Sequence, residues 1–475
     1  MRLSRATLGS LLPVVVQPVD SGPPSGRIVH LGIGAFHRAH QAIYTTDAGD
    51  GWAITGISLR SPQVRDALAP QDGLYTVTER SNGVAATRLV TAIDRILVGP
   101  EAPDAVIAAI ADPGTHVVTL TVTEKGYYRQ PSTGRLDRDD PAVASDLSGG
   151  APRTIYGYLA PALARRRATG AGGLSLVSCD NLSGNGRLLG ALLDDYLALT
   201  DPSLAEWARD HVACPDTMVD RIVPSSTAAD RAAVATSIGL DDAGAIVTEP
   251  FRQWVIEDRF AGPRPRWEKA GAQIAADVAP FELAKLRLLN ASHSTLAYMG
   301  LQLGHATVAD AIADPALRAF VSMQMEREAV PSLPDAPALD PAAYIAAILP
   351  RFANADLHHR LDQIAMDGSQ KLPQRWLATI AERHRRGQAS PLHMHSVAAW
   401  IAYTAAAPAI ASDPFADRYE AIWASAGGDP HEAVRRYLDD LGLFPALLTD
   451  QTAAIAAAVQ RWRSDPRAAL GKATA

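Results

Sequence analysis

Cysteine is nearly absent from this sequence, whose 475 residues include only two, Cys179 and Cys214. Two cysteines cannot form the disulfide framework of a small secreted domain. Long hydrophobic runs are missing as well, and no stretch approaches the roughly 20 apolar residues that a membrane-spanning helix needs. The short apolar run near the N-terminus contains Pro13 and lacks a small-residue cleavage site, which predicts an extended lead-in and no signal peptide. These absences predict a cytoplasmic protein.

A basic surface and several catalytic motifs are also lacking. The formal net charge of −7 argues against a general nucleic-acid binder, which is normally basic. There is no serine in a G-x-S-x-G elbow and no Walker A loop, which disfavours serine-triad acyl transfer and P-loop phosphoryl transfer. The histidines at His37 and His40, at 358–359 and at 393–395 do not have the spacing of a common zinc site. We therefore expect no metal, and no nucleic-acid or membrane partner.

What is present is the composition of an ordinary globular protein, 47% hydrophobic and 20% charged, with too many residues for one core. The first half alternates short β-rich runs with helical stretches, which predicts βαβ units and a parallel sheet. The buried-strand candidates are RIVHLGIG (27–34), WAITGISL (52–59), THVVTLTVT (115–123) and LSLVSCDN (174–181). After about residue 280 the β signal largely disappears, and helices broken by proline-rich loops follow.

This pattern predicts an N-terminal α/β Rossmann-like domain with a parallel-rich sheet, followed by a mainly α-helical C-terminal domain. We place the dinucleotide-binding domain at 1–280 and the substrate and catalytic domain at 281–475, with a ligand cleft between them. The arginine-rich runs at 165–167 and 382–386 are expected to be solvated helix faces.

The segment VHLGIGAFHRAHQ (29–41) follows a predicted strand and opens a predicted helix. Gly32 and Gly34 permit the tight turn and close backbone approach that a pyrophosphate above a helix N-terminus requires. His37 occupies the place of the third glycine of the usual fingerprint. The second strand ends in Arg60 with no nearby acid, so this chemistry leaves NAD and NADP both open. We expect the cofactor-binding residues to be Gly32, Gly34, Ala35, Phe36, Arg60 and Thr121.

The segment KLRLLNASHS (285–294) places three polar side chains in an otherwise apolar helix. At about 100° per residue, Lys285, His293 and Asn290 fall at roughly 0°, 80° and 140°, interleaved with leucines. A lysine that extends its ammonium group to water explains Lys285 alone. Together the three predict a site, where a desolvated lysine acts as a base and its neighbours donate to a hydroxyl or carbonyl oxygen. Asn181, at the end of another predicted strand, is a further candidate donor, although an Asx turn is the better explanation of it without other support.

Several long motifs carry a resemblance to a known family. They are IVHLGIGAFHRAHQAIY, LTVTEKGYY, SCDN, TMVDRIVP, EPFRQWVIED, KLRLLNASHS and IAMDGSQKLPQR. In these motifs the chain resembles the polyol-specific long-chain dehydrogenases, the mannitol dehydrogenase family. The resemblance implies a metal-free oxidoreductase in which Lys285 is catalytic and Asn181 and Asn290 form an oxyanion-hole-like pair. It also implies substrate contacts at His293, Asp220 and Lys371.

Within this family the chain is most similar to the fructuronate reductase (D-mannonate oxidoreductase) branch. Gln363 stands where mannitol dehydrogenases have arginine, and Ala402 stands where relatives often have arginine. The resemblance implies NAD(H)-dependent reduction of D-fructuronate to D-mannonate, with Lys285 supplying the proton. The substrate carboxylate would need a basic partner, for which Lys371, Arg375 and Arg360 are the candidates. An arginine suits a carboxylate best, because its fork can bind both oxygens.

Other functions remain open at this point. A mannitol 2-dehydrogenase or another polyol dehydrogenase would use the same chemistry on a neutral substrate. A lyase would use Lys285 to form a Schiff base and would need no nicotinamide. A non-catalytic nucleotide-binding module would bind NAD without turnover, although the intact set of lysine, asparagines and histidine argues against it. NADP is not excluded as the cofactor, and self-association is not predicted in either direction.

Overall fold

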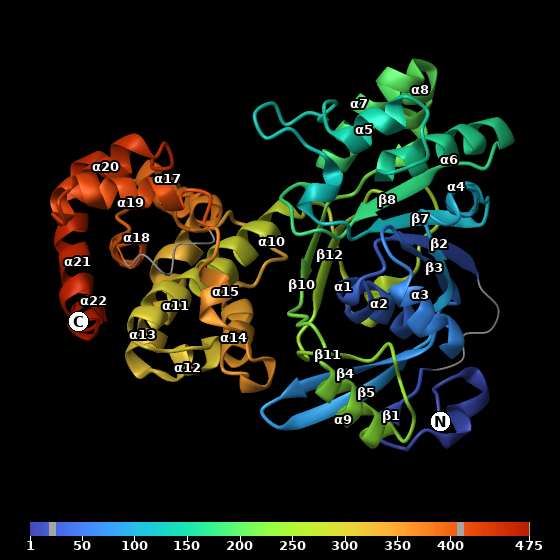
Figure 1. Cartoon of the computed structure of the whole chain (residues 1–475), viewed down its shortest axis with the longest axis horizontal. Helices are drawn as coiled ribbons and strands as arrows, with labels where there is room; N and C mark the ends of the chain where they lie inside the picture. Colours follow the sequence, from blue (N-terminus) through green and yellow to red (C-terminus); the bar gives the residue numbers. More distant parts are fainter. Residues whose placement is uncertain (19–24, 406–412, 475) are drawn as a thin grey trace. The chain divides into compact units, whose positions relative to one another are not determined.

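The computed structural model describes residues 1–18, 25–405 and 413–474 (Figure 1). The chain divides into two compact units, Met1–Ala279 and Pro280–Ala475. The first unit combines three β-sheets with helices, whereas the described part of the second contains helices and no strand. This confirms the predicted fold class, an α/β domain with a parallel sheet followed by a mainly helical domain. Within the described residues, every helix is too short or too polar to cross a membrane.

The largest sheet of the first unit has six strands in the order β6-β3-β2-β7-β8-β9, and every neighbouring pair is parallel. Counted along the chain within this sheet, the order is 3-2-1-4-5-6, which is that of a dinucleotide-binding Rossmann fold. The order reverses between β2 and β7, so ligands are expected beyond the carboxyl ends of these strands. The strands are β2 (Gly26–Leu31), β3 (Trp52–Ser58), β6 (Ile93–Val98), β7 (Thr115–Leu120), β8 (Leu174–Ser178) and β9 (Val212–Ala213).

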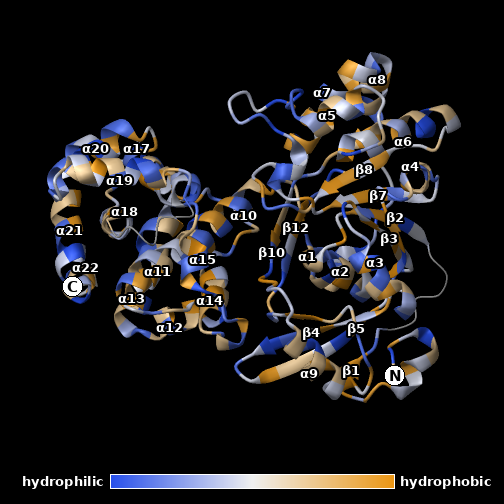
Figure 2. Ribbon diagram, in the orientation of Figure 1, coloured by the Kyte–Doolittle hydropathy of each residue, from blue (hydrophilic) through white to orange (hydrophobic). Residues whose placement is uncertain are grey.

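Apolar side chains cover both faces of this sheet, because successive residues of a strand point to opposite sides. One face contributes Val29, Leu31, Val118, Leu120 and Leu176 to a cluster with α4, α5, α6, α7 and α8. The other contributes Ile28, Ile54, Val117 and Val177 to a cluster with α1 and α2. β8 is accordingly drawn largely in orange in Figure 2. The helices of this unit are α1 (Ala35–Ala39), α2 (Gln41–Ala48), α3 (Gln63–Leu68), α4 (Pro103–Ala111), α5 (Pro141–Leu147), α6 (Ile155–Thr169), α7 (Asn185–Thr200), α8 (Pro202–His211) and α9 (Ala228–Ile238).

Two smaller sheets complete the first unit. One has the order β1-β5-β4-β11 and the other β10-β12-β13. β4 and β5 form a hairpin whose two turn residues, Asn82 and Gly83, have φ values of 51° and 78°. Asn-Gly is the preferred sequence for such a turn. The strands are β1 (Val15–Val16), β4 (Tyr75–Ser81), β5 (Val84–Val90), β10 (Thr217–Asp220), β11 (Ile246–Thr248), β12 (Gln253–Glu257) and β13 (Gln273–Ala275).

Three sequence predictions about local structure are wrong. The predicted extended lead-in contains a 3₁₀ helix, Arg5–Ser10. Arg166, in the run expected to be solvated, is fully buried and donates to backbone carbonyls of 110–115 and 171–173. Arg383, in the second run, is buried and donates to the carbonyls of Ala389 and Glu328. Both arginines supply donors to carbonyls that a helix end or loop leaves unpaired.

The second unit opens with one helical segment in three parts: α10 (Ala279–Ala284), the π-helical turn η5 (Lys285–Asn290) and α11 (Ala291–Gln302). Two further π turns are η6 (Gln324–Ala329) and η9 (Pro373–Leu377). The other helices are α12 (Val308–Ala313), α13 (Pro315–Met323), α14 (Pro341–Phe352), α15 (Leu361–Ala365), α16 (Gly368–Leu372), α17 (Ala378–Arg385), α18 (Pro391–Tyr403), α19 (Ala416–Ser425), α20 (Pro430–Asp440), α21 (Thr452–Ser464) and α22 (Pro466–Thr474).

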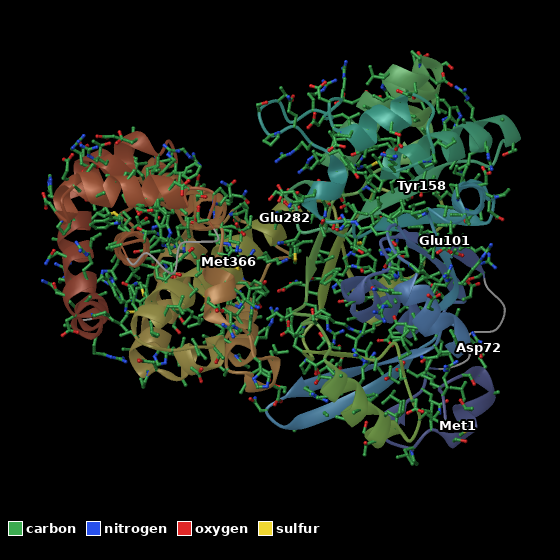
Figure 3. The ribbon with its side chains drawn as sticks, in the orientation of Figure 1. Met1, Asp72, Glu101, Tyr158, Glu282 and Met366 are labelled. Atoms are coloured by element: carbon green, nitrogen blue, oxygen red, sulfur yellow. The ribbon has the colours of Figure 1, made fainter. Side chains whose placement is uncertain are left out.

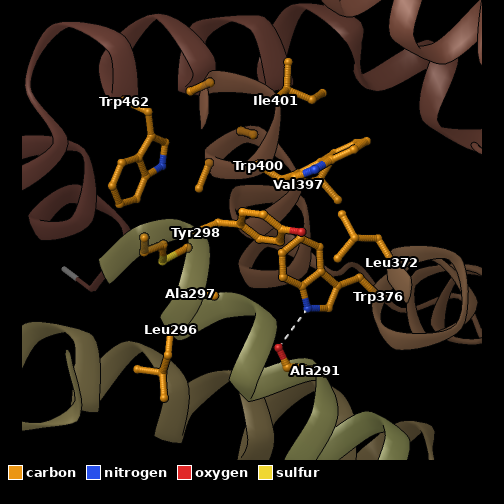
Figure 4. Close-up of a cluster of buried hydrophobic side chains, with 14 of the residues drawn as sticks. Ala291, Leu296, Ala297, Tyr298, Leu372, Trp376, Val397, Trp400, Ile401 and Trp462 are labelled. Atoms are coloured by element: carbon orange, nitrogen blue, oxygen red, sulfur yellow. Dashed lines mark hydrogen bonds between the residues drawn. The ribbon is translucent and has the colours of Figure 1, made fainter. Parts of the chain in front are cut away.

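The core of the second unit is built around large aromatic side chains (Figure 4). Tyr298 of α11 lies edge-on to Trp376 of η9, with ring centroids 5.9 Å apart. The Trp376 indole donates a 3.1 Å hydrogen bond to the carbonyl oxygen of Ala291, and the Tyr298 hydroxyl donates to that of Ala365. Buried tyrosine and tryptophan commonly pair their polar atoms in this way. The Trp376 bond fixes η9 against the junction of η5 and α11, and the Tyr298 bond connects α11 to the end of α15.

We expect Trp376→Phe to lower the melting temperature of the protein. The change keeps an aromatic ring but removes the indole bond to the Ala291 carbonyl, which also accepts from the Thr295 hydroxyl at 3.2 Å. The net loss of one such hydrogen bond costs about 0.5–1.5 kcal/mol. For a unit of this size, each kcal/mol corresponds to a shift of roughly 2–4 °C. Trp207→Phe, at a half-buried position of α8, is the matched control. Equal melting temperatures for the two variants would contradict the role given to the Ala291 bond.

Candidate active site

The predicted site residues lie in both units, and the part in the first unit surrounds a pocket of about 310 Å³ at the carboxyl ends of β2, β3 and β7. Four of the six predicted cofactor residues line this pocket: Gly32, Gly34, Arg60 and Thr121. The remaining two, Ala35 and Phe36, begin α1 directly after Gly34. The structure therefore gathers the predicted cofactor residues where a Rossmann fold binds its dinucleotide.

The two glycines of the pocket serve different purposes. Gly32 has a φ of +94°, and an added Cβ would lie 2.1 Å from the backbone oxygen of Thr121. Glycine is therefore required for β2 and β7 to end side by side. At Gly34 an added Cβ would meet no neighbour closer than 3.8 Å, so the protein's own packing does not demand glycine there. The open space above Gly34 fits the close approach of a pyrophosphate.

His37, in place of the third glycine, lies inside the protein and away from the surface. Its ring stacks on that of His30 with centroids 3.3 Å apart, and both residues are fully buried. His30 is hydrogen-bonded to Thr119 at 2.7 Å and to Thr121 at 2.9 Å. Burial lowers the pKa of His30 to about 3 and that of His37 well below its usual value, so both rings are neutral. In the described residues, no group of three side chains could hold a metal ion.

The carboxylate of Asp180, at the end of β8, fixes the far wall of this pocket. It accepts hydrogen bonds from the backbone N–H of Val122 and Thr123, at 3.0 and 2.8 Å, and from the Tyr127 hydroxyl at 2.9 Å. Thr123 has a φ of 67°, which is unfavourable for a β-branched residue and is found where surrounding contacts enforce it. Burial raises the pKa of Asp180, and these donors oppose that rise.

Sequence analysis overlooked Asp180, although it lies in the quoted SCDN motif. The signal was an acid at the end of a buried strand. The next residue, Asn181, is exposed and so begins the loop at the carboxyl edge of the sheet. Asp220, also predicted as a site residue, ends β10 and is buried. Its neighbour Arg221 forms an ion pair with Glu79 at 2.6 Å, which anchors this motif within the fold.

In the second unit, the helix that carries Lys285 is not a regular α-helix, and the predicted angular arrangement is wrong. The π turn η5 spans Lys285–Asn290, and the backbone N–H of Ala291 bonds to the carbonyl of Leu286, an i to i+5 bond. In such a turn residue i+5 lies about one turn beyond residue i. Asn290 therefore returns toward the face of Lys285, where regular α geometry would put it roughly 140° away. Both residues are half-buried.

His293, in the first turns of α11, is buried against two aromatic rings. Its ring centroid lies 4.6 Å from that of Phe352 and 5.1 Å from that of His359. Burial lowers the pKa of His293 well below 6.5, and the charges of His359, Arg375, Arg351 and Lys285 lower it further. Within the described residues its buried Nε2 atom has no hydrogen-bond partner. Because an unpaired buried nitrogen is costly, this atom is suited to a substrate hydroxyl.

His359 was considered in the sequence only as part of a failed metal motif, so its packing against His293 is a residue role that sequence analysis did not find. The signal available was weak, since 358–359 lies far along the chain from 285–294. The neighbourhood of His293 also contains several positive charges from separate elements: Arg375 of η9, Arg351 of α14 and Lys285 of η5. These charges all act on the His293 ring and disfavour its protonation.

Arg375 and Lys371 lie close together but are held by different partners. Arg375 donates through Nη1 to the carbonyl of Asn290 at 3.2 Å and to the Ser294 hydroxyl at 2.9 Å. Lys371 donates to the carbonyl of Met366 at 2.6 Å.

The Arg375 guanidinium forms no ion pair with any described residue, and its Nε and Nη2 atoms have no partner there. Desolvation lowers its pKa to about 10, so it remains charged at neutral pH. Burial, followed by the charge of Arg375, also lowers the pKa of Lys371. Arg360, in contrast, is 62% exposed and pairs with Asp362. A surface pair of this kind contributes little, and the geometry favours Arg375 over Arg360 as a ligand for an anion.

Comparison with known proteins gives matches over both units. Residues 26–269 match the mannitol dehydrogenase Rossmann domain, and residues 277–464 match the mannitol dehydrogenase C-terminal domain. The chain is 42% identical to the D-mannonate oxidoreductase of Escherichia coli, covering 83% of each protein. It is 40% identical to a mannitol 2-dehydrogenase of Pyrenophora tritici-repentis, covering 85% of this chain and 73% of that protein. A Pseudomonas fluorescens mannitol 2-dehydrogenase, solved as a ternary complex with NAD and D-mannitol, superposes with a TM-score of 0.82 at 33% identity, covering 100% of this chain and 99% of that one.

We expect Asp180→Asn to weaken dinucleotide binding and to lower the melting temperature. An amide presents only one acceptor oxygen, so one of the N–H groups of Val122 and Thr123 would lose its bond, at about 1–3 kcal/mol. The strained Thr123 would then relax into the pocket. Dinucleotide titration followed by calorimetry measures the effect, with exposed Asp139→Asn as the control. Wild-type affinity in Asp180→Asn would contradict this account of the pocket wall.

Proposed function

The chain belongs to the mannitol dehydrogenase family, and we propose from this that it is an NAD(H)-dependent oxidoreductase that reduces D-fructuronate to D-mannonate, reversibly. The family acts on CH–OH groups and the corresponding ketones. The substrate is a proposal of its own, since relatives of similar identity include both D-mannonate oxidoreductase and mannitol 2-dehydrogenases.

The observation that supports a uronate is the unpaired edge of Arg375. Its Nη1 atom is committed to Asn290 and Ser294, whereas Nε and Nη2 have no partner among the described residues. This edge has the spacing that binds both oxygens of a carboxylate. A desolvated guanidinium without an acid is costly, and a carboxylate on the substrate would offset that cost, whereas a neutral ketose would not.

Residues of η5 and of the loop after β8 would transfer the proton and stabilise the developing negative charge. Bound nicotinamide would supply the hydride to the keto carbon. Asn181 and Asn290 would donate amide N–H groups to the carbonyl oxygen as negative charge develops, and Lys285 would deliver the proton. In the oxidising direction, neutral Lys285 would take the hydroxyl proton. The His293 ring, whose pKa burial lowers well below its usual value, would be neutral and would bind a substrate hydroxyl.

The cofactor would occupy the pocket of the first unit. Gly32 and Gly34 would admit the pyrophosphate, and Thr121 and Arg60 would lie along its course. The similarity to a mannitol 2-dehydrogenase solved with NAD supports NAD(H) as the cofactor. That relative was also solved with D-mannitol, which keeps a polyol 2-dehydrogenase as the second candidate. A Schiff-base lyase has no support beyond Lys285 itself. Borohydride trapping of a Lys285–substrate adduct in the absence of nicotinamide would be the evidence for it.

Lys285→Ala should lower turnover by about 10²- to 10⁴-fold, the usual loss when a positioned acid or base is removed. Dinucleotide affinity should stay near the wild-type value, because Lys285 does not line the cofactor pocket. Steady-state kinetics with fructuronate and NADH, with and without added primary amines, measures both the loss and its chemical rescue. Exposed Lys269→Ala serves as the control. A Lys285→Ala enzyme with near-normal turnover would exclude the assignment.

Arg375→Met should raise the KM for fructuronate by about 10- to 150-fold, the range that a hydrogen bond to a charged group is worth. The kinetic constants for a neutral ketose should change far less. Because Arg375 also supports Asn290, the comparison between the two substrates is the informative quantity. Lys371→Met is the second test of this subsite, and surface Arg360→Met is the matched control. If fructose is the better substrate of the wild-type enzyme, the uronate assignment is wrong and the chain is a polyol dehydrogenase.

A further inference from the structure

We propose that Arg60 and Arg153 together bind a phosphate on the 2′-oxygen of the cofactor's adenosine ribose, so that the enzyme uses NADP(H) as well as NAD(H). The proposal rests on the dinucleotide cofactor of the proposed function. It adds Arg153, which no part of the sequence pointed to, as a determinant of cofactor specificity.

The position of Arg60 is the first observation. In Rossmann folds the adenosine ribose lies beside the end of the second strand, about 20 residues beyond the glycine-rich turn. Here β3 ends at Ser58, and Ser58, Leu59 and Arg60 all line the pocket. Its position just after the end of β3 therefore places Arg60 at the ribose end of the pocket.

Arg153 is the second cation in the pocket lining, and it lies in a segment far along the chain from Arg60. It directly precedes Thr154, the N-cap of α6, and the start of this 15-residue helix also lines the pocket. Its backbone N–H donates to Asp146 at 2.8 Å, which fixes the position of the residue. The positive end of the α6 dipole adds to the attraction for an anion. Two guanidinium groups on one pocket suit a phosphate, which they bind through paired N–H donors.

The pocket also lacks the acid that selects NAD. An aspartate or glutamate there accepts hydrogen bonds from the ribose hydroxyls and would repel a 2′-phosphate. In the described part of the chain, no residue lining the pocket is acidic. The acids that act on the lining residue Tyr128, Asp140 and Asp146, are engaged elsewhere, and Asp140 accepts from the backbone N–H of Ala142. Asp146 is buried and accepts from Arg153, from the Thr154 backbone and from the Thr154 hydroxyl. Glu101, labelled in Figure 3, pairs with Arg65.

Arg60 and Arg153 combine an unpaired guanidinium group with a place in the lining of the pocket. Surface arginines such as Arg27, Arg88 and Arg209 form ion pairs with aspartates. Within the described residues, the Arg60 and Arg153 guanidinium groups form no hydrogen bond and no ion pair. Both residues are exposed at the pocket, so each can turn toward a ligand without breaking a bond. An arginine pair that is left without acids beside a ribose site is suited to an anionic ligand.

The direct test is binding, which requires no turnover. Calorimetry with the full chain compares adenosine 2′,5′-bisphosphate with adenosine 5′-monophosphate. We expect the bisphosphate to bind at least tenfold more tightly at low salt, and its advantage to shrink as salt rises, because the arginines are exposed. The double variant Arg60→Ala/Arg153→Ala should lose this advantage while its affinity for the monophosphate changes less than twofold. Arg65→Ala is the control, because Arg65 lies five residues after Arg60 but is already paired with Asp66 and Glu101 and does not line the pocket.

A second measurement uses the reaction. Wild-type kcat/KM with NADPH should lie within tenfold of that with NADH, and Arg60→Asp should become selective for NADH. Equal affinity of the wild-type protein for the two adenosine phosphates would overturn the proposal, as would an advantage that survives the double substitution. The binding result stands whether or not fructuronate is a substrate, so failure of the proposed function and failure of this inference are distinguishable.

Discussion

The second unit depends on the hydrogen bonds that backbone carbonyl groups accept where the α10–η5–α11 helix changes from π to α geometry. At that junction the carbonyl oxygens of Asn290 and Ala291 accept side-chain donors from η9, Arg375 for the first and Trp376 for the second. Two π turns that are distant in sequence are thereby held together. The turn η5 brings Asn290 back toward Lys285, and η9 supplies the cation beside them. The π turns, the buried aromatic core and the candidate catalytic residues are therefore connected by the same hydrogen bonds.

In the first unit, a few specific contacts likewise determine the backbone course at the carboxyl end of the sheet. β2 and β7 can end side by side only because Gly32 has no side chain, and the loop after β7 takes its strained course at Thr123 because Asp180 accepts its N–H groups. The Rossmann strand order places this edge at a ligand site. The strands supply rigidity, and a few polar contacts at their ends shape the pocket.

Much of the fold was predictable from the sequence. Strands buried on both faces appear as apolar runs, and glycine marks turns that need a positive φ. The hairpin at Asn82 and Gly83 had an equally clear signal that was not used. The π turns had none, since a projection at a fixed angle assumes the regularity that they break. Arg166 and Arg383 were misjudged because composition does not reveal which arginine of a run meets unpaired carbonyls. Arg153 and His359 escaped notice because their neighbours come from distant segments.

The stacked pair of His30 and His37 carries a consequence for the first unit in acid. Burial holds both rings neutral, with the pKa of His30 lowered to about 3, as is that of the neighbouring His40. In an unfolded chain the same rings would bind protons below about pH 6.5. The unfolded state therefore takes up more protons as pH falls from 6.5 toward 3, and the free energy of unfolding declines across that window. The rings that pack beneath the nucleotide site thus set an acid limit on the domain that holds it.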